Sequence, residues 1–207
     1  NYATNECMTF ASDVFTGELE WYADIYSKSN LYAYYPYSSA GIPASYFTVY
    51  DQSEGIGAAD FMVASKSGVL PTTNSVTMVF KHMMTKLVIN VDNQSGAEVE
   101  GIGIEGTPQA TGLDLVDMTF TEFSGALPDE VPDPITAYES TAGKVWQAIV
   151  IPHSNAMSLV FTLSNKKVIT QSLAAMTLKS GGQYTINARL LPDNVIVSAS
   201  GEIQNWT

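Results

Sequence analysis

Hydrophobic and polar positions alternate in short runs along most of the chain. Alternation with a period of two is typical of a β-strand that has one buried face. The runs are rich in β-branched and aromatic residues and are separated by clusters of Gly, Pro, Ser, Asn and Asp, whereas windows with helical periodicity are scarce. This pattern predicts an all-β protein, built as one β-sandwich or a pair of them. The predicted strands are 18–26, 31–35, 46–50, 61–64, 76–91, 99–105, 118–123, 144–151, 158–163, 168–173, 183–191 and 195–199.

The long run at residues 76–91 changes its hydrophobic phase part of the way along. A phase change requires a bulge, a bend, or a strand that leaves one core and enters another. The change falls at Met83-Met84. We therefore predict two β domains, residues 1–75 and 76–207, joined by a long strand that crosses between their cores. The apolar positions are even before the change (Val76, Met78, Phe80) and odd after it (Leu87, Ile89, Val91).

Composition and charge narrow the functional classes. The 207 residues are 45% hydrophobic and 14% charged, which is the balance of a folded chain rather than a disordered one. The net charge of −12 and the single arginine, Arg189, argue against general nucleic-acid binding, because an acidic surface repels phosphate. One cysteine, Cys7, excludes a disulfide within the chain. No run of 18 apolar residues is present, so no segment is predicted to cross a membrane as a helix.

No sequence motif points to catalysis, a cofactor or a metal. The chain has no G-x-S-x-G, H-E-x-x-H or Walker A pattern. A G-x-G-x-x-G match at 101–106 lies inside an alternating strand and is followed by Pro108, so it does not open a nucleotide-binding helix. His82 and His153 have no ligand partners at metal-site spacing. We name no catalytic, cofactor-binding or metal residues, although paired carboxylates brought together by the fold stay open.

Aromatic residues are concentrated near the N-terminus, where residues 21–50 hold ten of the 22. Exposed Tyr and Trp side chains stack on sugars and offer a polar group. The alternative function is therefore a secreted carbohydrate-binding β-sandwich module. Its glycan contacts would be Trp21, Tyr34, Tyr35 and Tyr37, provided that they share an exposed concave face. If they do not, they are core residues of the first domain.

An ordered series of short segments resembles a known family. The order and spacing of these segments over residues 31–206 are similar to those of the fimbrillin-like family of Bacteroides-type bacteria. The segments are Tyr34-Tyr-Pro-Tyr37, Asp60-Phe-Met-Val-Ala64, Val76-Thr-Met-Val-Phe-Lys-His82, Lys86-Leu-Val-Ile-Asn90, Gln147-Ala-Ile-Val-Ile-Pro152, Leu178-Lys-Ser-Gly-Gly-Gln-Tyr184 and Ile203-Gln-Asn-Trp206.

The resemblance implies a fold, a function and a location. It implies two β-sandwich domains of transthyretin-like topology, export as a lipoprotein precursor, and a place at the cell surface or outer membrane. It implies a structural or adhesive subunit of fimbriae, as stalk, anchor or tip, that is not an enzyme and carries no cofactor. The implied partners are other fimbrial subunits, joined by donor-strand insertion, and a host or bacterial surface receptor or glycan.

Two features bear on how this chain fits such an assembly. The resemblance implies that some members mature by proteolysis at an N-terminal arginine. The single arginine of this chain, Arg189, lies in a predicted strand, so such a cleavage site is not in this sequence, which begins at Asn1 without an export signal. We expect a mature or trimmed start. The alternating run at 195–200 places Val195, Val197 and Ala199 on one face. It is either a donor strand for a neighbour or the last strand of this chain's own sandwich.

Overall fold

The computed structural model describes residues 5–21, 24–114, 117–125 and 134–205. The prediction of an all-β fold is confirmed, since these residues form seventeen strands and one short 3-10 turn, η1 (Gly57–Ala59). The strands are β1 (Thr9–Ala11), β2 (Val14–Thr16), β3 (Ser29–Tyr35), β4 (Ser45–Phe47), β5 (Met62–Val69), β6 (Lys81–His82), β7 (Thr85–Asn93), β8 (Val99–Glu105), β9 (Ala110–Asp114), β10 (Thr119–Thr121), β11 (Ile135–Thr136), β12 (Tyr138–Thr141), β13 (Val145–Val150), β14 (Ser158–Leu163), β15 (Val168–Ser172), β16 (Gly182–Leu190) and β17 (Val195–Asn205).

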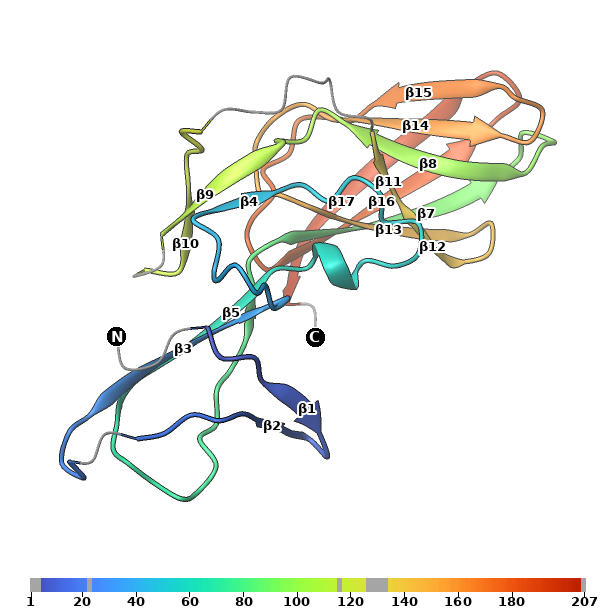
Figure 1. Cartoon of the computed structure of the whole chain (residues 1–207). Helices are drawn as coiled ribbons and strands as arrows, with labels where there is room; N and C mark the ends of the chain where they lie inside the picture. The colour runs from blue at the N-terminus through green and yellow to red at the C-terminus, as the bar shows by residue number, and fades with distance from the viewer. Residues whose placement is uncertain (1–4, 22–23, 115–116, 126–133, 206–207) are drawn as a thin grey trace.

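Two sheets pack face to face as a β-sandwich (Figure 1). One sheet has the order β11-β8-β14-β15 and the other β12-β13-β7-β16-β17. β7 and β16 run parallel at the centre of the larger sheet, and its other strand pairs are antiparallel. Alternate residues of both sheets point inward and form one buried cluster. Its fully buried members include Leu87, Ile89, Leu159, Phe161 and Ile186.

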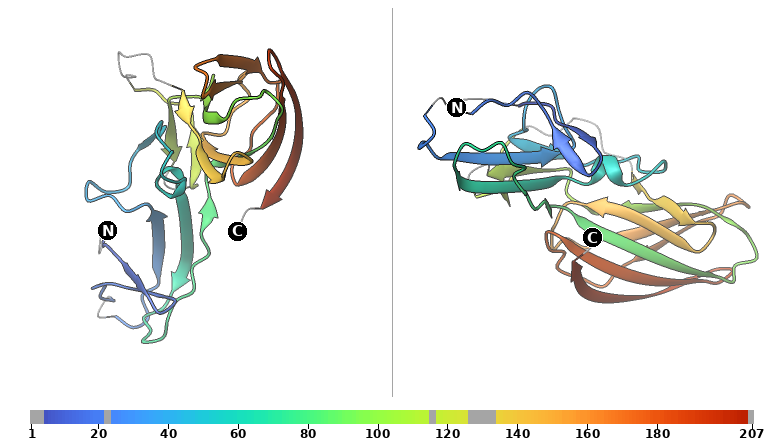
Figure 2. Two further views of the ribbon diagram at one scale, coloured as in Figure 1. Left: turned by 90° about the vertical axis from the view of Figure 1, so that its right-hand side faces the viewer. Right: turned by 90° about the horizontal axis from the view of Figure 1, so that it is seen from below.

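Two small sheets lie at one end of the sandwich (Figure 2), and their residues contribute to a second buried cluster. These sheets have the orders β3-β5-β6 and β10-β9-β4. The cluster includes Tyr46, Phe61, Met83, Met84 and Leu113. It combines residues from both sides of position 75, since β9 pairs with β4 and β10 pairs with β9. The division of the chain at residue 75 stays a prediction.

The hydrophobic phase changes where the sequence predicts it. His82 and the even positions before it are half-buried, whereas Thr85, Leu87 and Ile89 are buried after it. The predicted single strand is wrong in its continuity, however. β6 belongs to the small sheet with β5, whereas β7 belongs to the sandwich. Residues 76–80 of the predicted strand are not in a strand. The two methionines between β6 and β7 are both buried, because the second cluster surrounds the crossing.

The end of β13 is buried on both of its faces. Ala148 and Val150 point into the sandwich core, whereas Ile149 and Ile151 belong to the second cluster. This explains the unbroken apolar sequence at 148–151, because a strand covered on both faces does not alternate. β12 ends before it reaches Ile149, and the side-chain amide of Gln52 lies beside Ile149 in place of a neighbouring strand. Gln52 Nε2 donates to the carbonyl of Ile149 (2.8 Å), and Gln52 Oε1 accepts from the Ile149 N–H (2.8 Å).

Two local differences from the predicted strands have physical causes. The predicted strand at 18–26 is wrong over its described residues, because Asp24 closes a turn by accepting from the Tyr26 N–H (2.9 Å) and the Ser27 hydroxyl (2.7 Å). β9 was not predicted, since its short sequence contains Gly112. A Cβ at Gly112 would lie 2.4 Å from Thr121 Oγ1, so the glycine permits β10 to approach.

We predict that Leu159→Ala destabilises the protein by about 2–5 kcal/mol, because it leaves a cavity in the sandwich core. Leu159 is fully buried. The matched control is Ile196→Ala on the neighbouring sheet, where the side chain is 55% exposed. We expect the control to change stability by less than about 0.5 kcal/mol. Equal losses in urea unfolding would contradict this assignment of the core.

We also predict that Gln52→Leu destabilises the protein by about 1–3 kcal/mol, although leucine is similar in size and apolar. The substitution leaves the buried N–H and C=O of Ile149 without their partner on this side. Gln94→Leu, at an exposed position, is the control. Unfolding midpoints that shift no further for Gln52→Leu than for the control would show that the amide does not hold β13.

Candidate functional site

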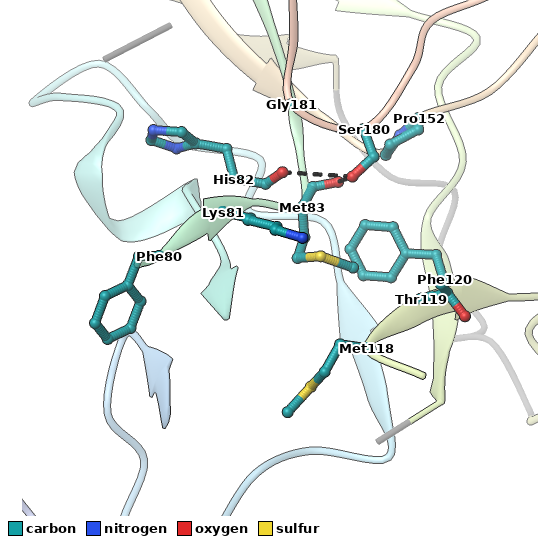
Figure 3. Close-up of a pocket in the computed structure, with 10 residues that line it drawn as sticks. All are labelled: Phe80, Lys81, His82, Met83, Met118, Thr119, Phe120, Pro152, Ser180 and Gly181. Atoms are coloured by element: carbon teal, nitrogen blue, oxygen red, sulfur yellow. Dashed lines mark hydrogen bonds between the residues drawn. The ribbon is translucent and has the colours of Figure 1, made fainter. Parts of the chain in front are cut away.

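A groove separates two sheet edges at the end of the sandwich (Figure 3). β6 is the edge strand of one small sheet and β10 is the edge strand of the other. The hollow between them has a volume of about 680 Å³. Its apolar lining comes from the connection before β6, the crossing after it, β10 and the end of β13: Phe80, Met83, Met118, Phe120 and Pro152.

The floor of the groove is the second buried cluster. Met83 is 5% exposed and belongs to that cluster, and Met118 and Phe120 pack against it. The ring of Phe120 stacks on the buried ring of Phe61 with 6.5 Å between centroids. Within the described residues, neither β6 nor β10 has a strand on its groove side. The groove therefore combines two edge strands with an apolar floor, and the Ser180 hydroxyl donates to the carbonyl of His82 at the edge of β6 (3.4 Å).

The imidazole of His82 is turned away from the groove (Figure 3), and the carboxylate of Asp60 holds it there. His82 Nδ1 lies 2.9 and 2.8 Å from the two carboxylate oxygens of Asp60. Burial raises the pKa of Asp60, and the hydrogen bond with His82 opposes this rise. On the other side, the Ser180 hydroxyl donates to the carbonyl of Met83 (2.8 Å) and fixes the crossing against the turn before β16.

Among the residues that the structure describes, Lys81 is the one lysine or arginine that lines the groove. The ion pairs of the described residues join His82 to Asp60, Lys166 to Glu100, Lys167 to Asp193 and Arg189 to Asp92, and none of them includes Lys81. The groove thus presents one cation on an otherwise apolar and neutral surface, apart from the imidazole of His82 at its border.

Free edges above an apolar floor are suited to binding an extended peptide. In strand addition, the main chain of an added strand pairs with an edge strand, and its alternate side chains enter the hollow beside that edge. In the part of the chain that the structure describes, no three metal-ligating side chains come together. No helix among those residues has the length and apolarity needed to cross a bilayer.

The four predicted glycan contacts do not line this groove. Trp21 Nε1 donates to the carbonyl of Thr72 (2.8 Å), and the Tyr34 hydroxyl donates to the carbonyl of Ser38 (3.0 Å). The polar groups of these two side chains are therefore used within the chain. Tyr35 and Tyr37 are 44% and 47% exposed. Glycan binding at these residues stays a prediction.

The predicted donor or terminal strand lies at the edge of the larger sheet. Val195, Val197 and Ala199 belong to β17 and stand opposite Leu190, Ala188 and Ile186 of β16. They therefore complete the sandwich of their own chain in this structure. A second role for these residues as a donor to another subunit stays a prediction.

Sequence reasoning did not find the groove. Residues 118–123 were predicted as a strand, but nothing in their spacing shows which side of the strand is free. β6 and β10 are far apart in the sequence and face each other only through the fold. Lys81 looked like an ordinary polar position in an alternating run. The only usable signal was the phase change at Met83-Met84, which marks the end of one sheet.

Comparison with known proteins places the chain in a family. A family model described as "Fimbrillin-like" matches residues 1–206. The chain therefore belongs to the fimbrillin-like family, and the predicted resemblance is confirmed. Among curated proteins, none matches this sequence.

Solved structures share the fold. A protein of Bacteroides uniformis described as a candidate cell adhesion protein has a TM-score of 0.71 at 19% identity, over 98% of this chain and 84% of that one. A similarly described protein of Bacteroides ovatus has a TM-score of 0.66 at 21% identity, over 93% and 75%. A fimbrial protein of Bacteroides vulgatus has a TM-score of 0.52 at 14% identity, over 100% and 86%.

We predict that His153, beside the groove residue Pro152, makes stability fall in mild acid. Its Nδ1 accepts from the Asn155 N–H (2.9 Å), and burial lowers its pKa below the usual 6.5. The pKa of His153 is therefore lower in the folded state than in the unfolded state. The contribution of neutral His153 to stability is complete above pH 6.5 and is lost as the pH falls toward the folded-state pKa.

The test compares urea unfolding of the native chain and of His153→Asn between pH 7.5 and 4.5. Asparagine can still accept from the Asn155 N–H but does not titrate, so the difference between the two proteins isolates the histidine. We expect the native chain to lose more stability than the variant below pH 6.5. Parallel curves for the two proteins would contradict the prediction.

Proposed function

We propose that this protein is a non-enzymatic structural or adhesive subunit of cell-surface fimbriae, and that it accepts an extended strand of another subunit in the groove between β6 and β10. The observation that carries the proposal is the pair of edge strands, β6 and β10, on either side of an apolar hollow. Membership of the fimbrillin-like family and the shared fold with a fimbrial protein support it.

The physical basis is the addition of a strand to two incomplete sheets. A strand in the groove would pair with β6 on one side and β10 on the other. Burying a large apolar side chain contributes about 2 kcal/mol, and several such side chains fit a hollow of this size. Part of this gain is offset by the entropy lost on association. The result is a stable junction that needs no covalent bond.

The proposal includes a location and partners. A fimbrial subunit acts outside the cell, at the surface or outer membrane, after export. Its main partners are other fimbrial subunits, and an adhesive subunit also contacts a surface receptor or glycan. The cell adhesion description of two relatives of the same fold supports this part of the proposal.

We predict that the purified chain forms SDS-resistant oligomers after limited trypsin treatment. Cleavage at Lys28 would separate the β1–β2 hairpin from the rest. The strand residues of this hairpin are exposed, and the ring of Phe15 lies 6.1 Å from that of Phe80, which lines the groove. The measurement is size-exclusion chromatography with light scattering, before and after trimming.

Two variants show whether the groove is the junction. Met118→Glu places a carboxylate against the apolar floor and should abolish the oligomers. Val168→Glu adds the same charge at an exposed apolar residue of β15 that does not line the groove, and should leave them unchanged. A chain that stays monomeric throughout, or oligomers unaffected by Met118→Glu, would count against the proposal.

A further inference from the structure

We infer that Lys81 selects the strand that enters the groove, by pairing with a carboxylate that the strand carries two residues from a large apolar side chain. This inference rests on the proposed strand-accepting function and identifies the chemistry of the partner. The occupant is an extended segment of another subunit, with an aspartate or glutamate and apolar residues on the same face.

The first step is the direction of the Lys81 side chain. Lys81 stands opposite Val63 in the ladder between β6 and β5, so the two side chains lie on the same face of the sheet. Val63 is buried in the second cluster, so this is the inner face. Lys81 therefore points toward the groove from the end of the sheet rather than toward its outer surface (Figure 3).

The second step is the spacing along the edge. The ladder continues past β6, because the Met83 N–H donates to the Phe61 carbonyl (2.8 Å). Met83 therefore shares its face with Lys81, two residues away, and both line the groove. A neighbouring strand meets them with side chains that are also two residues apart. Its partner for Met83 is apolar, and its partner for Lys81 is an acid.

The third step is charge. The chain has 21 carboxylates and 9 Lys and Arg residues, yet no described carboxylate forms an ion pair with Lys81. A strand in the groove would remove part of the water around this ammonium group. A wholly apolar strand would leave the charge covered and unpaired, and a basic strand would be repelled. Only an acidic strand supplies the missing partner.

The test uses three fluorescein-labelled peptides and measures binding by fluorescence anisotropy at low salt. The first is Thr-Val-Thr-Glu-Thr-Val-Thr-Val-Thr, which has one acid among alternating valines. The second has glutamine in place of the glutamate, and the third has lysine there. We expect the native chain to bind the glutamate peptide about fivefold more tightly than the glutamine peptide, and the lysine peptide more weakly than both.

The variant Lys81→Glu should reverse this order, so that the lysine peptide binds best. The matched control is Lys66→Glu on β5, which makes the same charge change at an exposed position that does not line the groove. It should keep the native order. Circular dichroism confirms that both variants fold.

The outcomes separate this inference from the function on which it rests. If the peptides bind, but Lys81→Glu keeps the native preference, Lys81 does not select the strand and the groove still accepts one. If Met118→Glu abolishes binding and Lys81→Glu reverses the preference, both proposals are supported. If none of the three peptides binds the native chain, the strand-accepting groove and the role of Lys81 are both overturned.

Discussion

The crossing of the chain at Met83-Met84 is the constraint on which the rest of the structure depends. Before it, the backbone forms the edge of a small sheet, and two residues later it starts a central strand of the sandwich. Both methionines are buried, and the Met83 N–H bonds to the Phe61 carbonyl. Because the chain leaves the first sheet so early, β6 is only two residues long. No later described strand covers its free side, so the groove is a direct consequence of the crossing.

The crossing packs on the second cluster, and the end of β13 fixes the position of that cluster. Ile149 faces the second cluster while its neighbour Val150 faces the sandwich, so one strand contributes to both cores. Gln52 completes the hydrogen bonding of Ile149 where β12 has ended. A strand buried on both faces and bonded on both sides has little freedom to shift. The groove therefore lies on a floor whose position is fixed by the fold of this chain.

Strands with a clear hydrophobic periodicity can be predicted from the sequence, whereas features that depend on tertiary contacts cannot. β8 and β14 were predicted to the residue, because their alternation is clean and both ends are marked by turn residues. The phase change was located correctly, since burial switches from even to odd positions at the crossing. β9 was missed because Gly112 weakens its strand signal, and the groove was missed because it joins edges that are distant in the sequence. Lys81 could not be assigned a role, because only its register with Val63 shows that it faces inward.

A groove that accepts one strand must also avoid pairing with other strands, and Lys81 bears on both requirements. Free strand edges are hazardous, since they pair with any exposed strand, and proteins protect them by making them short or by placing lysine on them. Both devices are present here: β6 has two residues, β10 has three, and Lys81 lies on the edge. A lysine on the outer face would only discourage pairing. In the role proposed for it on the inner face, beside Met83, it discourages most strands and favours an acidic one, so the same residue would protect the edge and select the strand.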